Sequence, residues 1–273
     1  MRTGDEGPAD TPGELRRAVG MSDHELLAAA ETAARAAADV LLAYQRQGDA
    51  VDVQTKSSPT DLVSQADVDA ERAIREVLAR LRPADAILGE EGDDVAGESG
   101  VRWVVDPLDG TINYLFGIPQ WCVSVAAEGH AGVILDPVRA ECFRATAGGG
   151  ATLDGEPLRA STADDLATAL VATGFGYEAQ VRRAQAEQVA ALLPQIRDIR
   201  RMGSAALDLA WTAAGRYDAF YERGVQRWDV AAGLLLCAEA GLERRELEAR
   251  GALPAGVLVA PPGIVDALHA IVG

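Results

Sequence analysis

The fold of this chain is best predicted from the run Trp103-Val104-Val105-Asp106-Pro107-Leu108-Asp109-Gly110-Thr111-Ile112-Asn113. An apolar strand leads directly to two carboxylates, and Pro107 is expected to stop that strand. The spacing of Asp106 and Asp109 lets a tight turn direct both carboxylates to one point. Gly110 and Thr111 then begin a predicted helix, whose free backbone N–H groups would attract an anion.

Two carboxylates beside an anion-binding helix start repel each other, and a hard divalent cation would resolve that conflict. Mg²⁺ prefers oxygen ligands and shares them with a substrate phosphate. The same pattern also fits an Asx-type turn followed by a threonine cap, without any metal. This run alone therefore leaves a metal site and a simple turn as alternatives.

Further acids stand at the ends of predicted elements, each with a structural alternative. Glu90 directly follows an apolar strand and a glycine, whereas the other acids of residues 83–100 are typical of a solvated loop. Asp229 precedes a long apolar run, where an acid also complements a helix dipole. Lys56, the single lysine of the chain, and Asp61 surround a Pro turn, where the lysine could be drift and the acid a cap.

The spacing of apolar residues predicts helices and strands on both sides of this run. A helix is expected from Ser22, which has capping-box spacing to Glu25, to about Gly48. The other expected helices cover 64–81, 178–193, 204–214, 228–240 and 264–272. Strands are expected at 86–88, 101–105, 121–127, 132–135, 141–145, 170–172, 199–202, 217–221 and 256–259.

This order of elements predicts how the chain is organised. Residues 1–20 are expected to be a disordered tail, followed by an N-terminal α+β half over 21–160 that carries the metal-binding loops. Strands and helices alternate in the C-terminal half, over 161–273, which is typical of a layered α/β arrangement.

Composition excludes several classes of function. The 273 residues include 42 acids and 25 bases, a formal net charge of −17, which would repel nucleic acid and anionic membranes. No apolar run approaches the ~18–20 residues that a membrane-spanning helix needs. The first twenty residues lack the apolar segment of a secretory signal. Three cysteines in apolar contexts fit a reducing cytoplasm.

Taken together, these pieces resemble the inositol monophosphatase family of Mg²⁺-dependent, lithium-sensitive sugar phosphatases. The resemblance runs in family order from about residue 50 to residue 240. The matching pieces are Lys56-Ser-Ser-Pro-Thr-Asp61-Leu-Val, Gly89-Glu90-Glu91, Trp103 to Tyr114, Arg201-Met-Gly203-Ser-Ala205-Ala206, Asp218-Ala-Phe-Tyr221-Glu222 and Trp228-Asp229-Val-Ala. The resemblance implies a layered αβαβα sandwich, the carbohydrate-phosphatase fold, commonly assembled as a homodimer.

The resemblance also implies a role for individual residues. Those that match metal ligands are Glu90, Asp106, the backbone carbonyl of Leu108, Asp109 and Asp229, with Asp106 bridging two of two or three Mg²⁺ ions. Asp61 and Thr111 match the pair that orients and deprotonates the attacking water, supported by Glu90 through a metal. The backbone of Gly110 and Thr111 matches the phosphate-holding segment, while Ala205 and Glu222 match contacts to the alcohol.

These matches predict a cytoplasmic, Mg²⁺-dependent phosphomonoesterase for a small sugar or polyol phosphate. Inositol monophosphate is favoured because Glu222 suits polyol hydroxyls. Histidinol phosphate and 3′-phosphoadenosine 5′-phosphate are alternative substrates, and a non-catalytic partner of the transcription machinery is an alternative of another class. Neither nucleic acid nor membrane is expected as a partner. Residues 242–255 depart from the family pattern and look helical or shortened, which puts the last strands in doubt.

Overall fold

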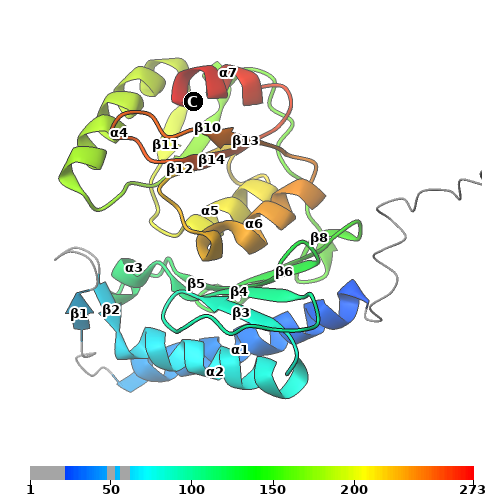
Figure 1. The fold of residues 1–273 in the computed structure, drawn as a ribbon. Coiled ribbons are helices and arrows are strands. Elements are labelled where there is room, and N and C mark those ends of the chain that lie inside the picture. Colours follow the sequence, from blue (N-terminus) through cyan, green and yellow to red (C-terminus); the bar gives the residue numbers. More distant parts are fainter. Residues whose placement is uncertain (1–21, 48–52, 56–61) are drawn as a thin grey trace, which may run out of the picture.

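The computed structural model describes residues 22–47, 53–55 and 62–273. Within these residues helices and sheets alternate in five layers, so the predicted αβαβα fold is confirmed (Figure 1). The predicted tail and the segment Lys56–Asp61 lie outside the described residues. None of the helices formed by the described part of the chain has the length and apolar character needed to cross a membrane.

The elements follow one another in a mixed order of helices and strands. They are α1 (Asp23–Gln47), β1 (Val53–Thr55), β2 (Leu62–Ser64), α2 (Gln65–Leu81), β3 (Ala86–Gly89), β4 (Arg102–Asp109), α3 (Thr111–Leu115), β5 (Cys122–Ala127), β6 (Ala131–Asp136), β7 (Glu141–Thr146), β8 (Gly150–Leu153), β9 (Glu156–Pro157), β10 (Leu170–Thr173), α4 (Ala179–Leu192), β11 (Asp198–Arg200), α5 (Ala205–Ala213), β12 (Ala219–Arg223), α6 (Arg227–Glu239), β13 (Glu243–Leu247), β14 (Gly256–Ala260) and α7 (Val265–Val272). Short 3₁₀ turns cover Leu166–Thr168 and Leu193–Gln195.

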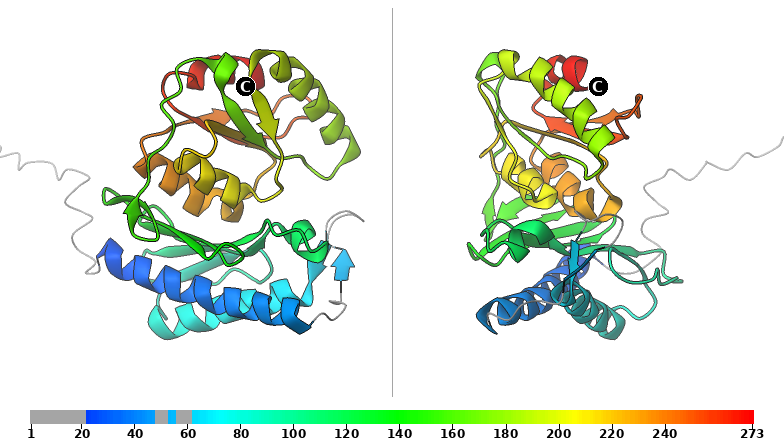
Figure 2. Two further views of the ribbon diagram at one scale, coloured as in Figure 1. Left: turned by 180° about the vertical axis from the view of Figure 1, so that it is seen from behind. Right: turned by 90° about the vertical axis from the view of Figure 1, so that its left-hand side faces the viewer.

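Two sheets form the frame of the molecule. The larger sheet has the order β3-β4-β5-β6-β7-β8-β9, and its pairs are antiparallel except for the parallel pair β3–β4. The smaller sheet has the order β11-β10-β12-β14-β13, with β10 parallel to both of its neighbours. Helices α1 and α2 cover the outer face of the larger sheet, and α4 and α7 cover the smaller one (Figures 1 and 2). Helices α5 and α6 fill the space between the sheets.

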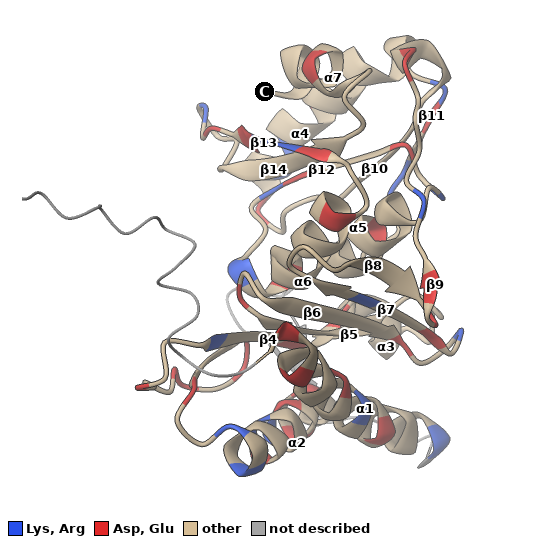
Figure 3. Cartoon of the chain, turned by 90° about the vertical axis from the view of Figure 1, so that its right-hand side faces the viewer, with Lys and Arg blue, Asp and Glu red and all other residues tan. Residues whose placement is uncertain are grey.

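Small residues let the helices approach the sheets closely. One face of α1 is almost entirely alanine, and its buried members are Ala29, Ala30, Ala33, Ala34, Ala37 and Ala38. A Cβ at Gly132 of β6 would lie 3.0 Å from the Cα of Ala232 in α6, so a glycine is required for that contact. Acidic residues occur in all three helix layers rather than on one face (Figure 3). Because α6 packs closely against β6, the position of the first turn of α6 relative to the larger sheet is fixed.

Strand β4 continues through Pro107, contrary to the expectation that the proline would end it. Its pairing with β5 shifts register between Asp106, which faces Ser124, and Asp109, which faces Cys122. The shift is a bulge, and a bulge tolerates proline because the residue there need not donate a hydrogen bond to the neighbouring strand. The bulge rather than a strand end therefore sets the spacing of the two carboxylates.

Residues 243–247 form a strand, so the helical interpretation of this segment is wrong. Strand β13 pairs antiparallel with β14, from Glu243 opposite Ala260 to Leu247 opposite Gly256. Its side chains alternate between more and less exposed positions and end at the buried Leu247. Pairing with a buried strand outweighs the favourable helix propensity of Glu, Arg and Leu.

Candidate active site

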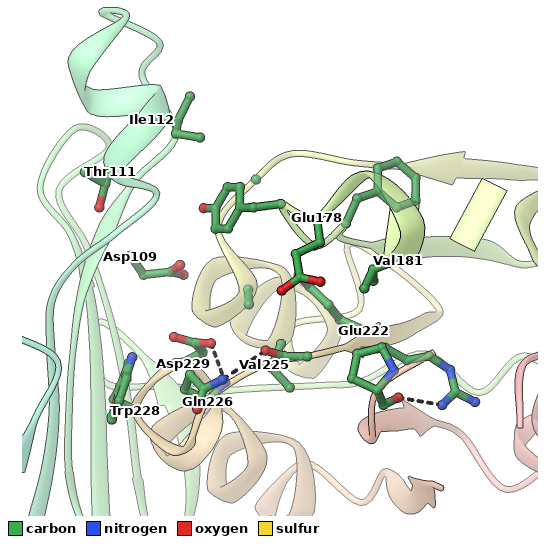
Figure 4. A pocket seen from close by; sticks show the side chains of 18 of the residues that line it. Asp109, Thr111, Ile112, Glu178, Val181, Glu222, Val225, Gln226, Trp228 and Asp229 are labelled. Atoms are coloured by element: carbon green, nitrogen blue, oxygen red, sulfur yellow. Dashed lines mark hydrogen bonds between the residues drawn. The ribbon is translucent and has the colours of Figure 1, made fainter. Parts of the chain in front are cut away.

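The four predicted carboxylate ligands come together at one edge of the larger sheet. Strands β3 and β4 are parallel and Gly89 pairs with Val105, so Glu90 and Asp106 follow at the same edge. The bulge of β4 brings Asp109 to this edge, and the first turn of α6 brings Asp229. All four line one cavity of about 790 Å³. Figure 4 shows Thr111, Asp109 and Asp229 on one side of this cavity, with Glu178 and Val181 across it.

Burial and mutual repulsion raise the pKa values of three of these carboxylates. Burial raises the pKa of Asp106 well above its ordinary value, and the charges of Glu90, Asp109 and Asp229 raise it further. Burial also raises the pKa of Asp109 to about 6, although hydrogen bonds from Ser204 and Ala206 oppose this. The pKa of Asp229 is raised by burial and then by the charge of Asp109. Such a cluster carries uncompensated negative charge that a cation would neutralise.

Backbone and hydroxyl donors hold three of the four carboxylates in place. Ser204 Oγ and the Ala206 N–H donate to Asp109 Oδ2, both at 2.6 Å. The Leu108 N–H donates to Asp106 Oδ1 at 3.0 Å. The Gln226 N–H donates to Asp229 Oδ2 at 2.7 Å, and Asp229 lies in the first turn of α6, where it also complements the helix dipole as the structural alternative proposed. The ligand set is therefore held in a fixed arrangement by the fold itself.

The chemistry of these donors fits Mg²⁺. All of the candidate ligands are oxygen atoms, which a hard cation prefers. Among the residues that the structure describes, no three His, Cys, Asp or Glu side chains lie close enough to bind one ion by themselves. A closed structural site would need such a group, whereas Mg²⁺ commonly takes one or two carboxylates and completes its shell with water and phosphate.

Thr111 contacts an acid that sequence reasoning missed. Its hydroxyl lies 3.2 Å from Asp67 Oδ1 and 3.0 Å from the Leu108 carbonyl oxygen. Asp67 is the third residue of α2 and only 1% exposed. It falls on the same helix face as Ala70 and Ile74, and an acid on an apolar face is a signal that could have identified it. The predicted partner, Asp61, lies outside the described residues, so that pairing stays a prediction.

Gly110 has the backbone conformation that the site requires. Its φ of 99° lies in the left-handed region, and a Cβ there would be 2.8 Å from the Gln120 carbonyl oxygen. Any other residue would strain this turn or push the neighbouring chain away. The predicted helix after it is confirmed but contains only five residues, Thr111–Leu115. Gly110 therefore fixes the position of Thr111 beside the carboxylates.

The residues predicted to contact the alcohol, Ala205 and Glu222, line the same cavity. Ala205 begins α5 and Glu222 lies in β12, so both come from the second half of the chain. Burial and the charge of Asp109 raise the pKa of Glu222 to about 8, against the opposing charge of Arg201. A Cβ at Gly174 would lie 2.0 Å from Glu222 Oε1, so the glycine leaves room for this carboxylate.

The turn that carries Glu90 is wrapped around a buried carboxylate from α2. Glu71 is 2% exposed and accepts hydrogen bonds of 2.7 Å from the Glu91 N–H and from Arg75 Nε. A Cβ at Gly89 would be 2.5 Å from Glu71 Oε1, and a Cβ at Gly92 would be 2.8 Å away. Glu71 therefore acts as a positioning residue for Glu90.

Removing this support should weaken metal binding. We expect Glu71→Gln to raise the Mg²⁺ concentration for half-maximal phosphate release by about 10–100-fold, the usual effect of losing an outer-shell partner. Calorimetric titration with Mg²⁺ should show the same loss of affinity. The exposed Glu76 of the same helix provides the control, because Glu76→Gln removes a similar charge without touching the turn. Equal Mg²⁺ dependence in both variants would contradict this role.

The chain is similar in sequence and in overall fold to several known proteins. The sequence model of the inositol monophosphatase family matches residues 22–269. Inositol-1-monophosphatase SuhB of Mycobacterium tuberculosis H37Rv is 48% identical over 233 residues, which is 80% of each chain. Nus factor SuhB of Xylella fastidiosa is 47% identical and covers 77% of each chain. The crystal structure of extragenic suppressor protein suhB from Bartonella henselae superposes with a TM-score of 0.84 at 34% identity, over 90% of this chain and 98% of that one.

Proposed function

Because the chain belongs to the inositol monophosphatase family and is a phosphoric monoester hydrolase, we propose that it hydrolyses a small polyol phosphate, inositol monophosphate first, with Mg²⁺ as cofactor. The observation that carries the proposal is the convergence of Glu90, Asp106, Asp109 and Asp229 on the cavity that also contains Thr111. Among the described residues that line this cavity, none is a cysteine or histidine. Water is therefore the nucleophile that we propose.

The carboxylates would hold two or three Mg²⁺ ions together with the Leu108 carbonyl. When bound, the metal supplies a coordinated water of lowered pKa and neutralises charge on the phosphoryl oxygens. Asp106 is the most deeply buried of the four, and we propose that its carboxylate would help to hold these ions. The Leu108 carbonyl oxygen lies 3.0 Å from the Thr111 hydroxyl, so this oxygen would connect the metal site to the hydroxyl.

Thr111 and Asp67 are proposed to orient the attacking water. A threonine hydroxyl has one proton and two lone pairs. When Asp67 accepts that proton, the hydroxyl oxygen accepts a hydrogen bond from the water and directs its lone pair toward phosphorus. The water oxygen then forms the new P–O bond and passes one proton by way of the Thr111 hydroxyl to Asp67, while the bond to the alcohol breaks and the alcohol oxygen takes up a proton from a second water molecule. Asp67 then returns its proton to solvent. Gly110 and the Thr111 backbone would hold the phosphate during this step.

The alcohol part of the substrate is proposed to reach Ala205 and Glu222. A carboxylate can accept hydrogen bonds from neighbouring hydroxyls, which favours a polyol. A carboxylate can also bind an amine, so histidinol phosphate is the second candidate, followed by 3′-phosphoadenosine 5′-phosphate.

A panel of substrates tests the choice. We expect inositol 1-phosphate to give the highest kcat/KM with Mg²⁺, followed by histidinol phosphate and 3′-phosphoadenosine 5′-phosphate, because only the polyol presents several hydroxyls to Glu222. Release of phosphate would be measured with Mg²⁺, then with added Li⁺, which should inhibit it. A strong preference for the nucleotide would exclude inositol monophosphate as the main substrate.

A second role is suggested by the name of one relative, the Nus factor SuhB of Xylella fastidiosa. It would make this chain a protein partner of the transcription machinery. The presence of every proposed metal ligand supports catalysis over a purely non-catalytic role. The cytoplasmic location and the homodimer stay predictions from the family resemblance.

A further inference from the structure

The cavity extends beyond Glu222 to a turn that departs from the family pattern. This turn, residues 248–255, is called the outer turn below. Its members Ala249, Gly251, Ala252, Leu253 and Pro254 line the cavity. Arg250 and Leu253 exchange two main-chain hydrogen bonds of 2.8 and 3.0 Å, which close the turn. At about 790 Å³ the cavity is in the range of sites for drug-sized ligands, so there is room beyond one phosphorylated ring.

Arg223 holds both ends of the outer turn. Its guanidinium Nη1 donates to the carbonyl oxygens of Glu248 and Pro254, each at 2.8 Å. Its Nη2 donates to the carbonyl of Val272 at 2.7 Å, which ties the turn to the end of α7. The side chain is 2% exposed. One planar cation therefore fixes the distance between the two ends of the turn.

Burial of the Arg223 guanidinium costs free energy of folding. Arg223 forms no ion pair with any residue that the structure describes, and its Nε has no hydrogen-bond partner there. Burial lowers its pKa, and the charge of Arg250 lowers it further. A buried charge without a carboxylate opposes folding unless its hydrogen bonds compensate. An apolar side chain would fill the same space at lower cost, but it could not hold two carbonyls at a fixed separation.

Arg223 is next in the chain to Glu222, the residue that is proposed to contact the alcohol. Glu222 and Arg223 are consecutive in β12, so their side chains leave the strand on opposite faces. Arg223 pairs with Gly256, and the Gly224 N–H donates to the Ala255 carbonyl at 2.8 Å. A Cβ at Gly256 would be 2.2 Å from the Glu222 carbonyl oxygen. The outer turn therefore cannot move without moving the strand that carries Glu222.

The surface that the outer turn presents to the cavity is apolar. Leu253 and Pro254 lie on it, and Phe175 and Val181 line the cavity from the α4 side. We propose that the outer turn, anchored by Arg223, contacts the alcohol part of the substrate and admits, in addition to polyol phosphates, phosphate monoesters whose alcohol carries an apolar group beyond the ester oxygen. The inference rests on the proposed phosphatase function and adds a second class of alcohol to it.

Two phosphate esters with the same type of leaving group test the inference. Ethyl phosphate and 2-phenylethyl phosphate differ only in the apolar group. For the unmodified protein with Mg²⁺ we expect kcat/KM to be at least about tenfold higher for 2-phenylethyl phosphate, the discrimination that one apolar group gives in a hydrophobic pocket. The difference should lie in KM, because the group does not reach the reacting atoms.

Substitutions of Arg223 and of the outer turn should remove the preference for 2-phenylethyl phosphate over ethyl phosphate. Arg223→Met should bring the ratio of the two kcat/KM values close to one, mainly through a higher KM for 2-phenylethyl phosphate. Ala252→Trp fills the cavity without touching the anchor and should also remove the preference, which keeps the test valid if Arg223→Met fails to fold. Arg250→Met is the matched control, because Arg250 is exposed in the same turn and does not line the cavity.

The outcomes separate the inference from the proposed function. If the unmodified protein releases phosphate from neither ester nor from any substrate of the panel above, the proposed function fails and the inference with it; if it hydrolyses inositol 1-phosphate but neither ester, only the inference fails. If it hydrolyses both esters equally, or if Arg223→Met and Ala252→Trp leave the ratio unchanged, only the role of the outer turn is overturned.

Discussion

Asp109→Asn is expected to reduce Mg²⁺-dependent phosphate release by about 10³-fold or more. The substitution removes one ligand charge, and a catalytic metal contributes several kcal/mol of charge stabilisation, with each 1.36 kcal/mol worth a factor of ten. Asparagine has nearly the same shape, and its carbonyl oxygen can still accept hydrogen bonds from Ser204 and Ala206. The fold should therefore be retained. A variant with nearly full turnover would show that Asp109 is not a metal ligand.

The same variant should be more stable than the unmodified protein when no metal is bound. Burial raises the pKa of Asp109 from 3.8 to about 6, so the folded state binds this proton more tightly than the unfolded state. Stability from this group is then lost as the pH rises from about 4 to about 6. Thermal unfolding in a chelator should show a smaller loss over this range for Asp109→Asn. Saturating Mg²⁺ should remove or reverse the difference, because the ion binds the carboxylate form.

The second large effect is expected at the hydroxyl that orients the water. Thr111→Ala should lower kcat by about 10²–10⁴-fold, the usual contribution of a positioned acid–base group. Asp67→Asn should have a similar effect, because an amide cannot take up the threonine proton. The Mg²⁺ dependence should change little in either variant, whereas Thr111→Ser keeps the hydroxyl and should retain most of the activity.

The two residues should behave as one unit. If Thr111 acts through Asp67, the double variant should lose no more activity than either single variant, since residues that act together are not additive. Asp61→Asn gives the comparison that decides between the two acids. Nearly full activity in Asp67→Asn, together with loss of activity in Asp61→Asn, would favour the pair predicted from the sequence over the contact seen in the structure.

The site was largely predictable from the sequence because its acids follow apolar strands. The pattern of apolar residues placed Glu90 at the end of β3 and the acid pair at the end of β4. Adjacent parallel strands then bring such residues to one edge. The starts of the helices at Ser204 and near Asp229 could also be predicted from the sequence, since caps and first-turn acids are clear local signals.

The parts that were missed depend on contacts distant in the chain. Asp67 stands out as an acid on the apolar face of α2, but its contact with Thr111 joins residues 44 positions apart in the chain. Pro107 lies in a bulge whose partner strand comes later in the sequence. Strand β13 has a helix-forming composition and becomes extended because β14 is available to pair with it.

The four proposed metal ligands come from two distant parts of the chain, which has a consequence for how the protein is made. Glu90, Asp106 and Asp109 belong to the part of the chain synthesised first, whereas Asp229 arrives with α6 after the smaller sheet has begun. A nascent chain that has emerged only as far as β9 lacks one of the four carboxylates. The complete ligand set therefore forms late in synthesis, and the ion cannot guide the folding of the first sheet through a finished site.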